Sequence, residues 1–362
     1  MSNLSIPPQR AYFRTFKQKP TVSIIINNYN YGRFLKAAID SVLFQRYTSL
    51  SAADIELIVV DDGSSDQSCE IIKSYGSLIL PIFKQNGGQD SAFNAGFQQS
   101  RGEIVCFLDA DDRFTPNKIE TVVKCFQQNP RIGWCFHEML LEDARTSATI
   151  CTTKAFPGPA QNLSQYCDFR KQLRLGSLSF YPVATSGLCF RRSVLQQILP
   201  MPETFIKTSA DRYVRLAALG LSPGYFIAQA LTVQGIHGNN LSTMRRDRPS
   251  IPERQIIIAY LLRTQFPELR RYANRLFSRG LAAYRSIKSS TVAANYQPFI
   301  RRYWQQCSLI EKLTITLLQF YHLRPWRQPI THKTADFYNF SAKRHSTLQS
   351  TEREPEKAPT AR

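Results

Sequence analysis

Short apolar segments alternate with segments of helical spacing along the first 130 residues, and this alternation restricts the fold more than any other feature. Four segments are rich in Val, Ile and Leu and short enough to be buried strands, at residues 22–27, 55–60, 78–83 and 103–108. Segments with apolar residues at helical spacing follow them, at residues 33–44, 68–75, 91–99 and 117–128. Strands and helices in this order form βαβ units. The sequence therefore predicts an α/β fold with a mainly parallel sheet and helices on both faces.

The pattern changes after residue 130 and divides the chain. Strands are predicted at residues 134–139, 186–190 and 224–233, helices at 192–198 and 211–219, and an irregular segment at 144–180. Helical spacing resumes after Pro252, at residues 256–263, 268–277 and 309–321. We expect four parts: a loose arm over 1–20, the α/β domain over 21–245, a basic helical extension over 246–340 and a disordered tail over 341–362.

Basic residues are concentrated in the last third of the chain. Residues 241–362 carry 22 Lys and Arg against 8 Asp and Glu, whereas residues 1–240 carry 24 against 19. Such a balance favours anionic partners, namely nucleotides, phospholipid surfaces or nucleic acid. No helix-turn-helix, zinc-finger or ribonucleoprotein signature is present, so we expect no nucleic acid partner.

An anionic membrane surface is the partner that this basic part suggests. Arginines recur along two predicted helices, with apolar residues between them, as interfacial helices require. The arginines are Arg263, Arg270, Arg271, Arg275 and Arg279, and the apolar residues are Ile256, Ile257, Leu261, Leu262, Leu269, Leu276 and Phe277. In the alternative interpretation, the apolar residues pack these helices against the α/β domain and the arginines are solvated.

Neither a membrane span nor a secretory leader is predicted. No segment reaches the roughly 18–20 apolar residues that a span needs, and the N-terminus lacks a hydrophobic core region. We therefore expect a cytoplasmic protein, at most peripheral on the inner face of the membrane. The eight cysteines are scattered without a Cys-x-x-Cys pair, which favours reduced thiols over disulfides or a zinc site.

Three carboxylates follow the fourth predicted strand. Asp109, Asp111 and Asp112 stand in the sequence DADD, and their repulsion is costly unless it is compensated. A divalent cation with a bound diphosphate would compensate it, and oxygen ligands of this kind suit Mg²⁺ or Mn²⁺. The alternative is a solvated acidic turn that caps the helix at Asn117.

Three other polar motifs follow predicted strands, where open α/β sheets bind ligands. DDGSSD at 61–66 offers carboxylates to a nucleobase or ribose, or caps the next helix. NNYN at 27–30 offers Tyr29 for stacking on a base, or as a rim residue packed on the first helix. NGGQDSAFNAG at 86–96 has two glycines that allow close approach of a ligand, or form a plain tight turn.

The set of motifs resembles the inverting family-2 glycosyltransferases. The matching segments are VSIIINNYN, LIVVDDGSSD, NGGQDSAFNAGF, GEIVCFLDADD with Pro116, SGLCFRRSVL, ADRYVRLAALG and IHGNNLS, which occur in the family's order over residues 20–245. The resemblance implies the A-type nucleotide-sugar-binding fold, a Rossmann-like sheet flanked by helices, with a C-terminal helical extension here. It also implies transfer of a sugar, with inversion, from a UDP-, GDP- or dTDP-sugar to a saccharide or lipid-linked acceptor, assisted by Mn²⁺ or Mg²⁺.

The resemblance also assigns roles to residues. Asp211 is the expected catalytic base, although it could be only a helix cap. Asp111 and His237 are the expected metal ligands, although His237 could be an ordinary loop histidine. Asp112, Gly187 and Asp211 are expected at the donor or acceptor sugar. The expected nucleotide contacts are Asn27, Tyr29, Asp61, Asp62, Asn86, Gly88, Gln89, Asn94, Asp109 and Ala110.

Two departures from the family pattern keep other functions open. Ala210 replaces the acid that usually precedes the base, and Gln234-Gly235 replaces the usual Tyr-Arg before the histidine. Arg212, Arg245 or Arg246 would then have to neutralise the phosphates. These departures favour a non-catalytic nucleotide-binding scaffold as one alternative. A nucleotidyltransferase is the other, although the first strand is not followed by a glycine-rich triphosphate loop.

Overall fold

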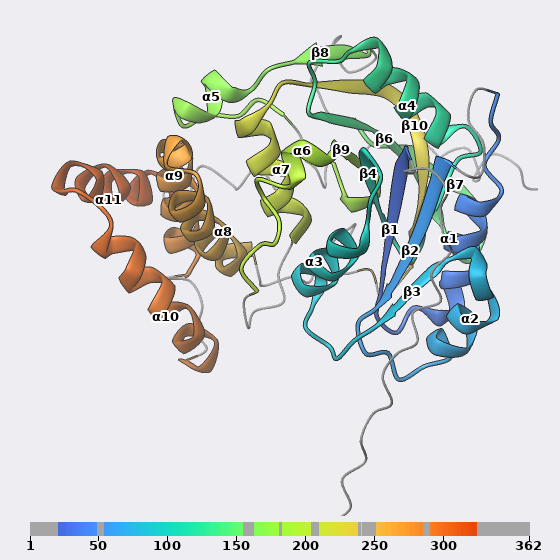
Figure 1. The fold of residues 1–362 in the computed structure, drawn as a ribbon. Coiled ribbons are helices and arrows are strands. Elements are labelled where there is room, and N and C mark those ends of the chain that lie inside the picture. The colour runs from blue at the N-terminus through green and yellow to red at the C-terminus, as the bar shows by residue number, and fades with distance from the viewer. Residues whose placement is uncertain are drawn as a thin grey trace, which may run out of the picture.

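A ten-stranded sheet with helices on both faces forms the centre of the molecule, and four C-terminal helices lie to one side of it (Figure 1). This computed structural model describes residues 21–48, 54–154, 163–180, 183–203, 210–237, 240, 251–284 and 290–323. The predicted loose arm at 1–20 and the predicted tail at 341–362 lie outside the described residues.

The elements have the following bounds. The strands are β1 Val22–Asn28, β2 Ile55–Asp61, β3 Leu80–Phe83, β4 Ile104–Asp109, β5 Asp112–Phe114, β6 Trp134–Asp143, β7 Thr149–Thr152, β8 Gln165–Cys167, β9 Leu188–Arg191 and β10 Gly224–Ile236. The helices are α1 Gly32–Leu43, α2 Ser68–Ser74, α3 Gln89–Gln99, α4 Lys118–Gln128, α5 Arg170–Arg174, α6 Arg192–Leu195, α7 Ala210–Leu221, α8 Ile251–Gln265, α9 Arg270–Tyr284, α10 Ser290–Gln305 and α11 Leu309–Leu323.

The predicted α/β class is confirmed, and the parallel pairing holds for the first part of the sheet. The strand order is β3-β2-β1-β4-β9-β6-β10-β5, and β3, β2, β1 and β4 pair in parallel. β9 then pairs antiparallel with both β4 and β6, so the whole sheet is mixed. The turn before β9 lies at the carboxyl end of β4, where Ser186 Oγ accepts a hydrogen bond from the Asp109 amide. From this turn β9 runs back along β4 in the opposite direction.

The apolar runs form the central strands because both faces of the sheet are covered. Val22, Ile24, Ile25 and Ile26 in β1 are all 0% exposed. On one face they pack with residues of α1, α2 and α4, and on the other with residues of α3, α6 and α7. A strand that is buried on both faces reads as a continuous apolar run, which is why the sequence identified these strands.

Three expectations about single elements were wrong. The segment 144–180 was expected to be irregular, but it contains β7, β8 and α5. The helix expected at 192–198 ends at Leu195. Helix α10 was not predicted, because Pro298 lies inside it and interrupts the helical pattern of the sequence.

The membrane hypothesis for α8 and α9 is wrong, because their apolar residues are buried. Ile256, Ile257, Ile258, Leu262 and Phe277 are at most 1% exposed and share a core with α5 and α7 of the α/β part. The packing alternative is therefore confirmed for this helix pair. Within the parts of the chain that the structure describes, no helix is both long enough and apolar enough to cross a bilayer.

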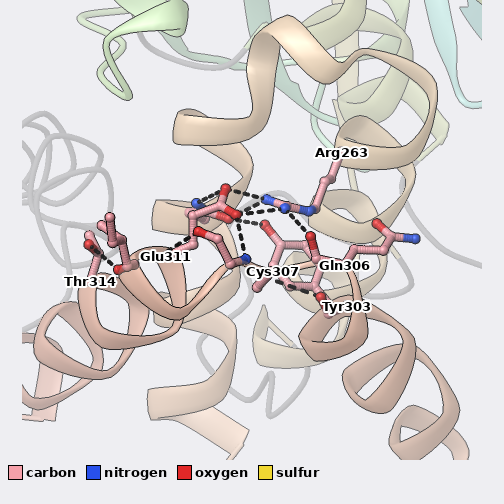
Figure 2. A network of polar contacts seen from close by, with 9 residues as sticks. Arg263, Tyr303, Gln306, Cys307, Glu311 and Thr314 are labelled. Carbon is pink, nitrogen blue, oxygen red and sulfur yellow. Dashed lines mark hydrogen bonds and ion pairs between the residues drawn. The ribbon is translucent and has the colours of Figure 1, made fainter.

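A polar network joins the four C-terminal helices (Figure 2). Arg263 of α8 donates to both carboxylate oxygens of Glu311 in α11, at 2.9 and 3.0 Å. Asn274 of α9 donates to Glu311 Oε1 at 3.2 Å and accepts from the Tyr303 hydroxyl of α10 at 2.8 Å. The amide of Ser308 donates to Glu311 Oε2 at 3.0 Å. Glu311 is therefore the acceptor on which this network converges.

Glu311→Gln is expected to destabilise the C-terminal helices in a pH-dependent way. The Arg263 guanidinium lowers the pKa of Glu311 from the ordinary 4.5 to about 2. A carboxylate with a lowered pKa stabilises the folded state above its unfolded pKa, and this stabilisation is lost as the pH falls. We expect the variant to lose about 2 kcal/mol of unfolding free energy near neutral pH, and the difference from the unmodified protein to shrink between pH 4.5 and 2.

Urea unfolding at several pH values measures this difference. Glu268→Gln is the matched control, because Glu268 is exposed and precedes α9 in the same part of the chain. The control is expected to unfold like the unmodified protein at each pH. A Glu311→Gln variant whose deficit is the same near pH 7 and near pH 3 would show that the ionised carboxylate contributes nothing.

Candidate active site

The polar motifs of the parallel strands meet at one edge of the sheet. β1, β2 and β4 are parallel neighbours, so their carboxyl ends lie side by side. Asn27 and Asn28 end β1, Asp61 ends β2 and Asp109 ends β4. The DADD segment then runs from β4 into β5, which pairs with β10. The sheet therefore brings NNYN, DDGSSD and DADD to one place, as expected for an open α/β sheet.

The three carboxylates of DADD form a close group. One oxygen each from Asp109, Asp111 and Asp112 lies within 4.8 Å of the others. Burial and the neighbouring Asp111 charge raise the pKa of Asp109 to about 7, and the same two causes raise the pKa of Asp112. The alternative of a solvated turn does not fit Asp112, which is 1% exposed. The group is a candidate cation site because it brings three carboxylate oxygens close together.

One orphaned oxygen tests whether a divalent cation fits this group. Asp112 Oδ2 accepts a hydrogen bond from Ser186 Oγ at 2.6 Å, whereas the buried Asp112 Oδ1 has no hydrogen-bond partner among the described residues. A buried acceptor without a partner is costly, and a cation would satisfy it. Hard oxygen donors are the ligands that Mg²⁺ and Mn²⁺ prefer. The donor set therefore fits either ion.

His237 and Asn240 approach Asp111 from the end of β10. His237 Nε2 lies 3.1 Å from Asp111 Oδ2, and Asn240 Nδ2 donates to the same oxygen at 3.3 Å. The imidazole stacks on Phe34 at 4.7 Å between ring centroids and lies 5.7 Å from Tyr31. His237 is thus held by two rings of the first helix region and faces the carboxylate group, as a ligand of a shared ion would.

A buried lysine contacts the turn that carries Ser186, next to the carboxylate group. Lys118 is 0% exposed and donates to the carbonyl of Ser186 at 2.7 Å and to Thr232 Oγ1 at 3.2 Å. Its ammonium also lies 3.4 Å from the centre of the Phe114 ring. Ser186 in turn contacts both Asp109 and Asp112. Lys118 therefore fixes the residue that joins two of the three carboxylates.

Two amide side chains contact the first carboxylate of DADD. Asn27 Nδ2 donates to Asp109 Oδ1 at 2.9 Å, and Gln89 Nε2 lies 3.4 Å from the same oxygen. Gln89 also reaches Thr185 Oγ1 at 3.3 Å. The structure therefore brings Asn27, Gln89 and Asp109 together, although Asn27 and Asp109 lie at the ends of different strands and Gln89 begins α3.

Asp61 and Asp62 hold the turns around the site. Asp61 Oδ1 accepts from Asn28 Nδ2 at 2.8 Å, and its Oδ2 accepts from the Ser64 amide at 3.1 Å. Asp62 accepts from the amides of Gly87 and Gly88 at 2.9 and 2.7 Å. Gly88 has a φ of +91°, which glycine adopts without strain. The glycine turn is therefore bonded directly to the carboxylate that the sequence assigned to the nucleobase.

Tyr29 and Asn86 lie in the turns after β1 and β3. The Tyr29 ring is 47% exposed at the turn after β1. Asn86 Oδ1 is buried and has no hydrogen-bond partner among the described residues. A partly exposed ring and a buried acceptor without a partner are both features that a bound nucleobase could use.

Three residues of the predicted site have evident packing or scaffold roles. Asn94 bonds the backbone of Met201 in both directions at 2.8 Å, so it ties α3 to the segment before α7. A Cβ on Gly187 would lie 2.3 Å from Val183 Cγ1, so packing alone requires glycine there. The side chain of Ala110 is 2% exposed and packs in the core. Among the described residues, no hydrogen bond joins Asn94 to the carboxylate group.

Asp211 lies at the start of α7. It is the second residue of that helix, and its charge is one of the causes that raise the pKa of Asp109. Arg215 lies one turn further along, with its Nη1 3.6 Å from Asp211 Oδ2, and also donates to the carbonyl of Val183. Arg215 is 5% exposed, so it holds the Asp211 side chain from a fixed position.

The departure from the family pattern at Gly235 has a steric explanation. A Cβ at this position would lie 2.8 Å from the carbonyl oxygen of Asp111. A side chain as large as arginine therefore cannot stand there without moving the DADD backbone. Arg212 lies on α7, whereas Arg245 and Arg246 are outside the described residues.

Sequence reasoning missed four residues that organise the site: Lys118, Ser186, Thr232 and Asn240. Ser186 and Asn240 lie in segments that the sequence had singled out, SGLCFRRSVL and IHGNNLS, so those segments were the available signal. Lys118 and Thr232 had no such signal. Their roles depend on α4 and β10 packing against the same turn.

Comparison with known protein families identifies one match. The model of glycosyl transferase family 2 matches residues 23–198. An uncharacterised glycosyltransferase of Nostoc sp. is 35% identical over 223 residues, which cover 60% of this chain and 66% of the relative. One of Rickettsia prowazekii is 38% identical over 135 residues, which cover 36% of this chain and 40% of the relative. The chain thus matches between two fifths and two thirds of the length of these relatives.

Comparison with solved structures supports the fold. The structure is similar to S. aureus TarS 1-349 in complex with UDP-GlcNAc, with a TM-score of 0.53 and 17% identity over 81% of this chain and 77% of that chain. The same protein in complex with UDP has a TM-score of 0.52 and 17% identity over 93% and 94% of the two chains. At this level of identity the likeness establishes the fold alone.

Proposed function

The chain belongs to glycosyl transferase family 2, and we propose that it transfers a sugar from a nucleoside-diphosphate donor to an acceptor hydroxyl with inversion at the anomeric carbon. One observation supports the proposal: Asp109, Asp111 and Asp112 form a candidate cation site at the carboxyl edge of the sheet, and Asp211 lies at the start of α7 with its charge acting on Asp109. The carboxylate group would hold a cation at the charged diphosphate, and Asp211 would act as the base for an acceptor hydroxyl.

The donor nucleotide would lie along the ends of β1, β2 and β4. The exposed ring of Tyr29 and the orphaned oxygen of Asn86 would contact the base, and Asp109 the ribose. Asp62 would act there mainly through the glycine turn that it holds. TarS, which shares the fold, binds UDP-GlcNAc. UDP-sugars are therefore the first donors to test, with GDP- and dTDP-sugars beside them.

Asp111 and His237, with the orphaned oxygen of Asp112, would hold Mn²⁺ or Mg²⁺ at the diphosphate. When bound there, the ion neutralises the negative charge that the leaving diphosphate gains as its bond to the sugar breaks. His237 is fixed by Phe34 and Tyr31, so it would keep its orientation as donors bind and leave.

Asp211 would act as the base. Its carboxylate takes the proton of the acceptor hydroxyl while the acceptor oxygen forms its bond to the anomeric carbon. The bond between that carbon and the diphosphate oxygen breaks on the opposite side, and the electron pair leaves with the diphosphate. A single displacement of this kind inverts the configuration, through a transition state like that of glycoside hydrolysis. The proposed acceptor is a saccharide or a lipid-linked acceptor.

Donor hydrolysis across a panel tests the proposal. The full chain is incubated with UDP-, GDP- and dTDP-sugars, with and without Mn²⁺, and nucleoside diphosphate release is measured. We expect one nucleotide class to be hydrolysed, with stimulation by Mn²⁺, and the released sugar to have inverted configuration by NMR. Binding without bond cleavage for every donor would instead favour a non-catalytic scaffold, and pyrophosphate release from a nucleoside triphosphate would favour a nucleotidyltransferase.

A further inference from the structure

Helix α11 carries its apolar side chains on the outside of the molecule. Leu309, Ile310, Leu313, Leu317 and Phe320 are 84%, 79%, 63%, 61% and 57% exposed. At about 100° per residue, these five positions fall within an arc of about 100° on the helix surface. We call these five residues the α11 arc. In Figure 1, α11 lies at the outer edge of the C-terminal helices, on the side away from the sheet.

The opposite face of α11 is anchored, so the helix cannot turn its apolar side chains inward. Ile315 and Gln319 are 0% and 5% exposed. Glu311 is paired with Arg263 of α8 in the network that Figure 2 shows. The outward direction of the α11 arc therefore follows from contacts that several helices share.

The orientation of α11 is the reverse of the usual orientation of a helix on a protein surface. A helix on a protein surface usually turns its apolar stripe inward and its charged residues outward. Here the two charged residues of α11, Glu311 and Lys312, lie outside the arc. A contiguous group of large exposed apolar side chains of this kind marks an interaction surface rather than ordinary solvent-facing protein.

Exposed arginines lie on the two helices that neighbour α11. Arg301 and Arg302 are exposed on α10, which leads directly into α11, and Arg270 and Arg271 are exposed at the start of α9, which packs on α11. Residues 324–345, which follow α11 in the sequence, contain five Lys and Arg, one Asp and four aromatic residues. An apolar helix face with exposed arginines on the neighbouring helices is complementary to an anionic lipid interface.

We propose that the α11 arc, with the exposed arginines of α9 and α10, is a peripheral docking surface for an anionic lipid bilayer. Helix α11 has 15 residues and would lie in the plane of the interface, with its arc among the upper acyl chains. A second copy of the chain fits the surface less well, because association through it would bring two basic surfaces together. The docking proposal can be tested independently of the sugar transfer proposed above, because the experiment measures vesicle binding and not activity.

Vesicle co-sedimentation of the full chain tests the proposal. The vesicles contain phosphatidylcholine with one quarter phosphatidylglycerol, or phosphatidylcholine alone, at low and at moderate salt. The unmodified protein is expected to bind the anionic vesicles at low salt and to bind less at moderate salt. Replacing two residues of the arc together, Leu313→Gln with Leu317→Gln, is expected to weaken binding by roughly tenfold or more, because both side chains would leave the acyl region.

A matched variant and two further measurements separate the outcomes. Leu163→Gln alters a side chain that is 63% exposed, as Leu313 is, but that lies just before β8. It is expected to bind vesicles like the unmodified protein, and circular dichroism checks that all variants are folded. Equal binding by the Leu313/Leu317 variant, or no binding by the unmodified protein at low salt, would overturn the proposal. So would a dimer in gel filtration that the Leu313/Leu317 variant converts to a monomer.

Discussion

Replacing Asp211 by Asn is expected to lower the rate of sugar transfer by roughly 10²–10⁴-fold, the usual contribution of a positioned general base. Asparagine keeps the size of the side chain but cannot take the proton of the acceptor hydroxyl. Its contact with Arg215, which now lies 3.6 Å from Asp211 Oδ2, keeps a hydrogen-bond acceptor. The local structure at the start of α7 should therefore be preserved while the base is lost.

Two measurements distinguish a lost base from a damaged site. Calorimetry with the nucleoside diphosphate and Mn²⁺ should give nearly the same affinity for Asp211→Asn as for the unmodified protein, since Asp211 is proposed to serve the acceptor. Asp168→Asn, which removes a carboxylate that is exposed and distant in sequence, is the charge-matched control and should transfer at the normal rate. Near-normal transfer by Asp211→Asn would mean that another group is the base.

The sequence predicted the part of the fold that depends on local apolar patterns. β1, β2 and β4 were located within one or two residues, because strands buried on both faces are continuous runs of Val, Ile and Leu. The antiparallel strands β5 and β8 have only three residues each. Such short strands exist through their pairing partners, which are far away in the sequence, so no local pattern identifies them.

The sequence predicted the motifs of the candidate site, but it did not predict the residues that hold those motifs in place. Asp109, Asp111 and His237 lie in recognisable segments, and the structure brings them together. Lys118 stands in a helix and has no sequence pattern that distinguishes it from a surface lysine. Only the packing of α4 under the turn at Ser186 makes it a buried support. Gly187 and Asn94 show the opposite case, in which a residue within a family motif has an evident structural role.

The membrane hypothesis shows a further limit of sequence patterns. Helical spacing identifies which residues share a face, but not what covers that face. In α8 and α9 the apolar face is covered by α5 and α7, whereas the α11 arc faces outward. Arg263, which the sequence placed either at a lipid surface or in solvent, is paired with Glu311 inside the helical network. The basic composition therefore did not identify which helix exposes an apolar face.

Replacing Asp111 by Asn is expected to abolish the dependence of nucleoside diphosphate binding on Mn²⁺. Asp111 belongs to a group of three carboxylates whose nearest oxygens lie within 4.8 Å, and His237 and Asn240 both approach its Oδ2. An amide removes one negative ligand but keeps the shape of the side chain. We therefore expect Mn²⁺ to raise the affinity of the unmodified protein for the diphosphate, and the variant to bind with the weaker, metal-free affinity under both conditions.

Calorimetric titration of UDP, GDP and dTDP, each with and without Mn²⁺, measures this effect. The loss in the presence of Mn²⁺ is expected to be at least about 10–100-fold, because changes that only reorient a metal ligand already cost that much. Asp168→Asn again serves as the charge-matched control and should retain the full response to Mn²⁺. Equal affinity of the unmodified protein with and without Mn²⁺ would argue against a cation at the diphosphate. The carboxylate group would then need another source of compensation, and Lys118 is the nearest candidate because it already contacts the turn that holds Asp109 and Asp112.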